Sequence, residues 1–326
     1  MVTIKLITSD SYVWNKLSVI AQFTSAVCNK HPVCIDLLNE GPAFENLDIY
    51  QSIRDICETY NYDLENITVT TCNLYQQPID NIEFEITFPN HFVYNTVKLL
   101  ENVNTEKNIS KTFGLFVGRS NSHRLDLSSY LFNHYKDQTD QTFHYDPSDE
   151  YHRNNLGLDG LLAIAGVEVS TEISQFLQQC PMISSESVTY PILMDQHCNM
   201  YSRYQNFFTE VVCETSYVGE TFFPTEKIWR PIAMMTPFIV QGPQNFLHRL
   251  QKLGFKTFDR WWDEGYAEDP ADWQTVEIKK VINFLSNKSI NELQKIYNEM
   301  LPTLEHNKKL LIDMNQQFVD STVCTN

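Results

Sequence analysis

The sequence predicts an α/β protein made of two Rossmann-like domains that face each other across a cleft. Short runs rich in β-branched residues alternate along the chain with stretches of helical periodicity, which is typical of parallel sheets covered by helices. The 326 residues also exceed what one compact core usually holds. Two domains of α/β type are therefore expected.

The first domain is expected to span residues 1–108. Hydrophobic periodicity places strands at residues 2–8, 32–38, 67–72 and 84–88, and helices at residues 11–28, 47–60 and 94–100. Residues 101–111 are polar and poor in apolar side chains, so this stretch is the expected linker.

The second domain is expected to span residues 109–288. A strand at residues 112–117 precedes a helix at residues 125–135, and residues 144–157 indicate a surface loop. A regular run then predicts strands at residues 209–214, 237–241 and 256–258, with helices at residues 225–234 and 244–253 between them. Two consecutive strand–helix–strand crossovers indicate a Rossmann-like half. Residues 289–326 predict a C-terminal helix, with a kink or break at Pro302, that can pack back on the first domain.

Charge and composition limit the classes of partner and the cellular compartment that the sequence predicts. The chain carries 41 acidic and 24 basic side chains, a net charge of −17, with no basic run, so duplex nucleic acid is a disfavoured partner. Neither a signal-peptide pattern nor about 18 consecutive apolar residues occurs, so no membrane span is expected. The eight cysteines lack CxxC spacing, and several lie in apolar runs as reduced, buried side chains do. These features predict a cytoplasmic protein.

The most informative stretch, residues 207–243, reads FFTEVVCETSYVGETFFPTEKIWRPIAMMTPFIVQGP. Its strand delivers Glu214 to the carboxyl edge of the sheet, where open α/β sheets bind ligands. Thr225 then occupies a helix N-cap position, followed by Glu226 and Lys227 in the first turn. Free N–H groups at a helix start and the Lys227 ammonium suit a diphosphate, and a carboxylate can accept sugar hydroxyls. The alternative is an ordinary, well-capped helix start.

This stretch resembles the donor-binding core of the α-1,3/4-fucosyltransferase family. The family pattern runs Glu-Asn-Ser, Thr-Glu-Lys, then Pro-Val/Ile and Gly; the matching positions here are Glu214-Thr215-Ser216, Thr225-Glu226-Lys227, Pro237-Phe238-Ile239 and Gly242. Thr215 replaces the family's Asn and Glu220 lies in the loop, which leaves the donor sugar open. Glu214, Thr225, Glu226 and Lys227 are therefore candidate donor-binding residues.

A second stretch, residues 113–132 (FGLFVGRSNSHRLDLSSYLF), adds to the resemblance. The family has a His-Arg pair before a helix, and the match implies that Arg124, which follows His123, reaches the nucleotide diphosphate. Arg119 is a further candidate on chemistry alone, since a guanidinium fork suits phosphate. The alternative for each arginine is a solvated surface charge, and the family match favours the phosphate role for Arg124.

The resemblance implies a GT-B fold, inverting transfer and no cofactor or metal. The implied co-substrate is a nucleotide sugar, GDP-fucose or a related donor, and the implied acceptor is a glycan hydroxyl. The sequence contains no Asp-x-Asp motif and no His/Asp/Cys cluster with ligand spacing, so no metal site is expected.

Inverting transfer needs a general base, expected after a strand of the first domain. Glu40 fits best by position, with Asp10, Glu83 and Glu85 as alternatives, although each is also typical of a solvated carboxylate. Residues 259–273 (DRWWDEGYAEDPADW) combine aromatic and acidic side chains. This composition suits a site that stacks on an acceptor sugar or a base, and the alternative is that Trp261 and Trp262 are core residues.

Two other readings remain open. One is a glycosyltransferase with a different donor that acts on nucleic acid bases or protein. The other is a non-catalytic two-lobed protein that binds a nucleotide or sugar. A nicotinamide-dependent dehydrogenase is disfavoured, because no G-x-G-x-x-G follows a strand and the chain has only 10 glycines.

Overall fold

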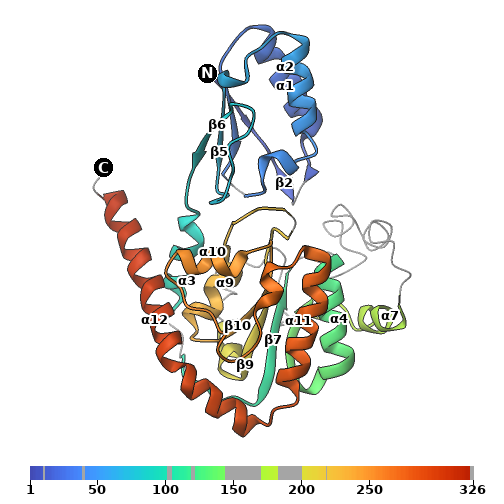
Figure 1. The fold of residues 1–326 in the computed structure, drawn as a ribbon, viewed down its shortest axis with the longest axis vertical. Coiled ribbons are helices and arrows are strands. Elements are labelled where there is room, and N and C mark those ends of the chain that lie inside the picture. The colour runs from blue at the N-terminus through green and yellow to red at the C-terminus, as the bar shows by residue number, and fades with distance from the viewer. Residues whose placement is uncertain are drawn as a thin grey trace.

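Two separate parallel sheets form the framework of the chain (Figure 1). The computed structural model describes residues 1–9, 12–38, 41–100, 105–118, 122–143, 170–182, 200–217 and 219–323. Within these residues each parallel sheet has four strands, and a short antiparallel pair, β2 (Thr8–Ser9) and β3 (Tyr12–Val13), stands apart. The predicted α/β class is confirmed.

The first sheet has the strand order β1-β4-β5-β6, and all neighbours run parallel. Its strands are β1 (Val2–Lys5), β4 (Val33–Leu37), β5 (Ile67–Thr71) and β6 (Glu83–Ile86). Helix α1 (Lys16–Cys28) packs against β1 and β4, and α2 (Tyr50–Thr59) packs against α1. The strands are rich in β-branched residues and the helices are amphipathic, so both bury their apolar faces in one core.

The second sheet has the order β10-β9-β7-β8, again parallel throughout. Its strands are β7 (Lys111–Val117), β8 (Thr139–Phe143), β9 (Phe207–Cys213) and β10 (Phe238–Gln241). Its helices are α4 (Ser122–Tyr135), α7 (Thr171–Leu177), α9 (Glu226–Ala233), α10 (Phe246–Lys252) and α11 (Ala271–Ser286). All of β9 is buried, as expected for a central strand covered on both faces. Short 3-10 helices occupy Phe44–Asn46, Leu64–Asn66, Lys136–Gln138, Ser202–Gln205 and Gly265–Glu268.

Two further helices lie between and beside the sheets. Helix α3 (Asn90–Leu100) precedes the predicted domain boundary, and its buried Val93 belongs to the core of the second sheet. Helix α12 (Ile290–Val323) packs against α3 and α9 (Figure 1). Its Phe318 ring stacks on Phe88, just past β6, with centroids 5.4 Å apart. In the segment after α3, the Lys107 ammonium donates to Thr236 Oγ1 at 2.7 Å, so the end of the predicted linker is anchored to the second sheet.

The predicted and observed elements differ in several places. Residues 256–258 are not a strand, because Asn307 of α12 takes both backbone groups of Lys256: the Lys256 N–H donates to Asn307 Oδ1 and the Asn307 amide donates to the Lys256 carbonyl, each at 2.8 Å. The second predicted crossover therefore has no closing strand. Helix α12 continues through Pro302 without a break. Strand β8 was not foreseen, and the predicted loop at residues 144–157 lies outside the described residues.

No helix in the described ranges is both long enough and apolar enough to span a lipid bilayer.

Candidate functional site

The residues of the predicted donor motif meet at the carboxyl end of β9. Glu214 follows the last residue of β9, and Thr225 is the N-cap of α9, which begins at Glu226. β9 pairs with β7 on one side and β10 on the other, so these residues lie at the centre of the sheet's carboxyl edge. The strand, the cap and the helix were all predicted from local pattern and are confirmed.

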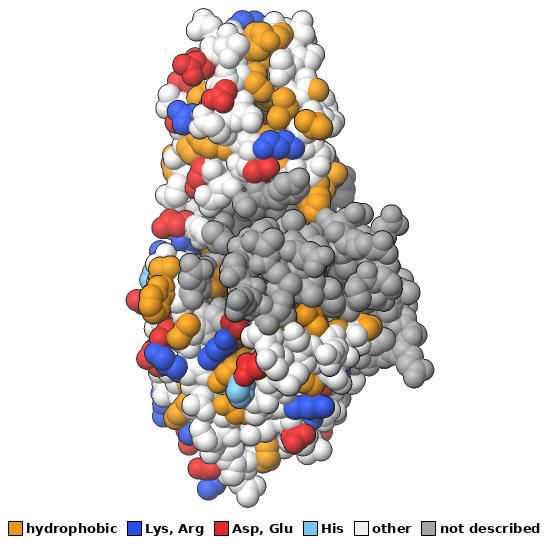
Figure 2. All heavy atoms as spheres, turned by 90° about the vertical axis from the view of Figure 1, so that its right-hand side faces the viewer, with side chains coloured by type: hydrophobic (Ala, Val, Ile, Leu, Met, Phe, Trp, Pro, Cys, Tyr) orange, Lys and Arg blue, Asp and Glu red, His pale blue; other side chains and the backbone are white. Residues whose placement is uncertain are grey.

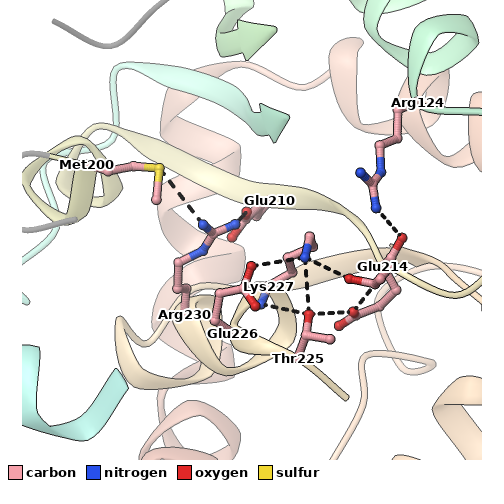
Figure 3. A network of polar contacts seen from close by, with 9 residues as sticks. Arg124, Met200, Glu210, Glu214, Thr225, Glu226, Lys227 and Arg230 are labelled. Atoms are coloured by element: carbon pink, nitrogen blue, oxygen red, sulfur yellow. Dashed lines mark hydrogen bonds and ion pairs between the residues drawn. The ribbon is translucent and has the colours of Figure 1, made fainter. Parts of the chain in front are cut away.

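A continuous hydrogen-bond chain links the cap to the buried strand end (Figure 3). The Thr225 hydroxyl donates to Glu214 Oε2 at 2.8 Å and also accepts the Lys227 backbone N–H at 3.4 Å. The Lys227 ammonium donates to Thr215 Oγ1 and to Glu226 Oε1, both at 2.9 Å. A cation is thereby held at the start of α9, where the helix dipole also favours an anion.

The pKa values of the two carboxylates in this cluster shift in opposite directions. Burial raises the pKa of Glu214, which is 1% exposed, although Lys227 and Thr225 act in the other direction. Burial would raise the pKa of Glu226 as well, but Lys227 and Arg230 lower it to about 2. Glu226 is therefore ionised at neutral pH, and its side chain keeps 29% exposure, so it can accept hydrogen bonds from a ligand.

Arg124 reaches the same place from α4. It is 4% exposed, and its Nη2 donates to the Glu214 backbone carbonyl at 2.8 Å. The structure thus brings the predicted Arg124 to the predicted strand end. Arg119 lies outside the described residues.

His123, to which the sequence assigned no role, lies beside this cluster. Its ring stacks on Tyr217 with centroids 4.1 Å apart and planes 12° apart, and the Tyr217 hydroxyl is 3.1 Å from Thr275 Oγ1. Burial lowers the pKa of His123 well below its ordinary value, with a further contribution from the charge of Arg124. The imidazole is therefore neutral at neutral pH. Its buried Nε2 makes no hydrogen bond within the described part of the chain.

A buried ion pair behind α9 was also missed. Arg230 lies one helical turn after Glu226 and is 5% exposed, with its Nη2 3.6 Å from Glu210 Oε1. The Tyr204 hydroxyl donates to the other oxygen of Glu210 at 2.6 Å. Beside Arg230, between α3 and α9, lies a pocket of about 170 Å³, lined by Phe92, Asn95, Thr96, Leu99, Tyr201, Glu226 and Arg230. The i,i+4 spacing of Glu226 and Arg230 was the available signal for this shared face.

Loops at the carboxyl ends of the first sheet contact the segment just before α9. The Ala43 N–H, after β4, donates to Thr221 Oγ1 at 3.1 Å. After β5, Asn73 Oδ1 accepts the Phe222 N–H at 2.9 Å. A Cβ on Gly41 would lie 2.7 Å from the Phe223 ring, so only glycine permits this approach. The carboxyl edges of both sheets therefore meet next to the α9 start.

The four candidates for the general base fall into two pairs. Glu40 and its alternative Asp10 both lie outside the described residues. Glu83 and Glu85 lie within β6 and not beyond its carboxyl end.

The tryptophans of residues 259–273 divide between core and surface. Trp262 is 4% exposed and belongs to the core of the second sheet, and Trp261 packs partly buried against it, as the core reading expected. Trp273 is 66% exposed on α11. A surface pocket of about 600 Å³ lies between this stretch and α11, with Trp262 and Tyr266 in its lining.

Comparisons with protein-family models, curated proteins and solved structures return no match. The described residues also contain no group of three or more His, Cys, Asp or Glu side chains arranged to hold a metal ion.

Proposed function

We propose that this chain is an inverting, metal-independent glycosyltransferase with a GT-B-like arrangement. It takes a sugar, fucose or a related one, from a nucleotide-sugar donor and transfers it to a hydroxyl of a glycan acceptor. The proposal is carried by one observation: the cap, carboxylate and ammonium of Thr225, Glu226 and Lys227 converge with Arg124 at the carboxyl edge of a parallel sheet.

Each part of this cluster matches one part of a nucleotide sugar. The N–H groups at the start of α9 and the Lys227 ammonium suit a diphosphate, because both place positive charge at one point. The Glu226 carboxylate, ionised and partly exposed, suits hydroxyl groups of the ribose or the transferred sugar. The described partners of the Lys227 ammonium are side-chain oxygens of Thr215, Thr225 and Glu226 around the α9 start, and a phosphate oxygen can take the place of such a partner.

The placement of the two sheets supports an acceptor side opposite the donor side. Loops after β4 and β5 contact residues 221–223, next to the α9 start. Ligands of open α/β sheets bind outside the carboxyl ends of the strands, and here both carboxyl edges border one region.

In the proposed reaction the acceptor hydroxyl attacks the anomeric carbon from the face opposite the diphosphate. A new carbon–oxygen bond forms, the bond to the diphosphate oxygen breaks, and the hydroxyl proton passes to a general base. Lys227 and Arg124 stabilise the charge that develops on the departing nucleotide diphosphate. Glu40 stays the predicted base.

Thermal unfolding with GDP-, UDP-, ADP- and CMP-sugars and the free nucleotides tests the proposal. A donor at 100 times its Kd should stabilise the protein by ~2.7 kcal/mol. Lys227→Met should abolish this stabilisation, whereas Lys280→Met, which removes an ammonium exposed on α11, should leave it intact. Glu40→Gln should keep donor binding and lose transfer. Stabilisation by none of the nucleotides would contradict the proposed function.

A further inference from the structure

The pocket of about 170 Å³ between α3 and α9 adjoins the proposed donor site and has no assigned role. Helix α3 contributes four lining residues from Phe92 to Leu99 at i, i+3, i+4 and i+7, so they share one face of the helix. Helix α9 contributes Glu226 and Arg230, which lie one turn apart, and Tyr201 also lines the pocket. We refer to it as the α3–α9 pocket.

The α3–α9 pocket has an exposed end and a buried end. The Glu226 side chain keeps 29% exposure, whereas Arg230 and Tyr201 are 5% and 1% exposed. On the α3 side, the Phe92 ring meets the Phe223 ring edge-on with centroids 5.8 Å apart, and Phe223 lies just before α9. The exposed end of the pocket therefore lies at the start of α9, where the phosphates of a donor are proposed to bind.

The same end of the pocket borders the first sheet. A Cβ on Gly41 would lie 2.7 Å from the Phe223 ring, so the backbone at Gly41 closely approaches Phe223. Gly41 directly follows Glu40, the predicted general base. A group held at the exposed end of the pocket would thus lie between the α9 start and the chain segment that carries the predicted base.

Arg230 brings an unpaired hydrogen-bond donor to the buried end. Its Nη2 lies 3.6 Å from Glu210 Oε1 and its Nη1 lies 3.9 Å from the Met200 sulfur (Figure 3). Its Nε is buried and makes no hydrogen bond within the described residues. A buried N–H without an acceptor is destabilising, and a ligand oxygen in the pocket can supply that acceptor.

The lining residues favour a neutral ligand that carries hydroxyl groups. They contribute one carboxylate, Glu226, and one guanidinium, Arg230, so a ligand with a net charge would be attracted by one and repelled by the other. Hydroxyl groups both donate and accept, and therefore suit both residues at once. On the face shown in Figure 2, acidic and basic side chains are interspersed. Charges act over only about 8 Å at physiological salt, so the nearest side chains set the charge that a ligand meets.

We propose that the α3–α9 pocket holds the transferred sugar of the donor and that this sugar is a neutral monosaccharide. This inference rests on the proposed function. With the diphosphate at Lys227, the sugar enters beside Glu226, donates to its carboxylate and accepts from Arg230 Nε, and its anomeric carbon stays at the exposed end. Pockets for drug-sized ligands measure about 300–1,000 Å³, so this smaller one holds a single ring and not a whole nucleotide sugar.

Calorimetric titration of free nucleotides and their sugar forms tests the inference. The probes are GDP with GDP-fucose and GDP-mannose, UDP with UDP-glucose and UDP-glucuronate, and ADP with ADP-glucose. Asn95 lines the pocket, and Asn95→Phe fills it with a ring. This variant should weaken binding of the sugar form about ten-fold or more, because the sugar loses its hydrogen bonds, and should change the Kd of the free diphosphate less than about two-fold. Lys98→Phe, exposed on the same helix and outside the lining, should alter neither.

A milder variant keeps the inference testable if the phenylalanine destabilises α3. Asn95→Leu replaces the amide by an apolar group of similar size and should weaken the sugar forms alone, by several-fold. The thermal midpoint of each variant without ligand checks the fold.

Three outcomes would overturn the inference and leave the proposed function in place. They are an unchanged ratio of the two affinities in Asn95→Phe, an equal loss for the free diphosphate, and tighter binding of UDP-glucuronate than of UDP-glucose. The second would assign the pocket to the nucleoside. If the wild type binds none of the probes, the proposed function fails as well, which separates that result from a failure of the pocket alone.

Discussion

Replacing the buried Glu210 by Gln should change how the stability of the protein depends on pH. Glu210 lies in the middle of β9, is 1% exposed, and interacts with Tyr204 and Arg230. Burial raises its pKa to about 7, against the opposing effects of Arg230, Tyr204 and Lys107. Its carboxylate is thus disfavoured in the folded protein even with a guanidinium nearby.

The direction of this pH dependence follows from the number of protons that the folded and unfolded states bind. Between pH 4.5 and about 7 the folded protein holds a proton on Glu210 that the unfolded chain has released, so the free energy of unfolding falls as pH rises through this window. Each pKa unit corresponds to about 1.36 kcal/mol, so the whole window amounts to roughly 3 kcal/mol. From pH 5.5 to 8 the same relation gives roughly 2 kcal/mol. Glutamine cannot ionise, so the free energy of unfolding of the variant lacks this decrease with rising pH.

Urea-induced unfolding of the wild type and Glu210→Gln at pH 5.5, 6.5, 7.2 and 8 measures the effect. The stability of the variant relative to the wild type should rise by roughly 2 kcal/mol across this range, whatever the substitution does to packing. Tyr204→Phe removes a hydrogen bond that favours the carboxylate, so it should move the window to higher pH. A difference that is constant with pH, or that falls, would refute the reasoning.

Three further substitutions test contacts around the site by urea unfolding. Gly114→Ala places a Cβ 2.5 Å from the Phe207 ring, so overpacking should cost about 1–3 kcal/mol, and Phe207→Leu in the same chain should recover part of it; no loss would contradict this contact. Thr225→Val removes the α9 cap and should cost about 1 kcal/mol, and an unchanged midpoint would argue against the cap. Asn73→Ala leaves the buried Phe222 N–H without its acceptor and should cost about 1–3 kcal/mol, with faster hydrogen exchange at Phe222; unaltered exchange there would be inconsistent with that bond.

Local pattern predicted the secondary-structure elements at the centre of the candidate site. The apolar run of β9, the Thr225 cap and the start of α9 all depend on residues within one or two turns of each other. Such short-range signals can be read from one sequence, because strand periodicity and cap chemistry need no distant partner. The same reasoning placed Trp262 among the candidates for the core.

Other features depend on residues far apart in the chain. Residues 256–258 have a strand-like composition, yet Asn307 supplies the hydrogen bonds that a neighbouring strand would have supplied. Glu210 lies within the strand predicted at residues 209–214, and only the packing of α9 shows that it faces Arg230. No spacing in the sequence encodes these pairs.

The sequence by itself therefore determined the α/β class and the position of the Thr225–Lys227 turn, since both follow from contacts between near neighbours. Only the tertiary structure decided that the edge of the first sheet meets the segment before α9, through Asn73 and Phe222, 149 residues apart. It also decided that the Arg124 side chain bonds to the end of β9. The physical reason is that burial and partner choice are set by how the sheets and helices pack, which is a property of the whole chain.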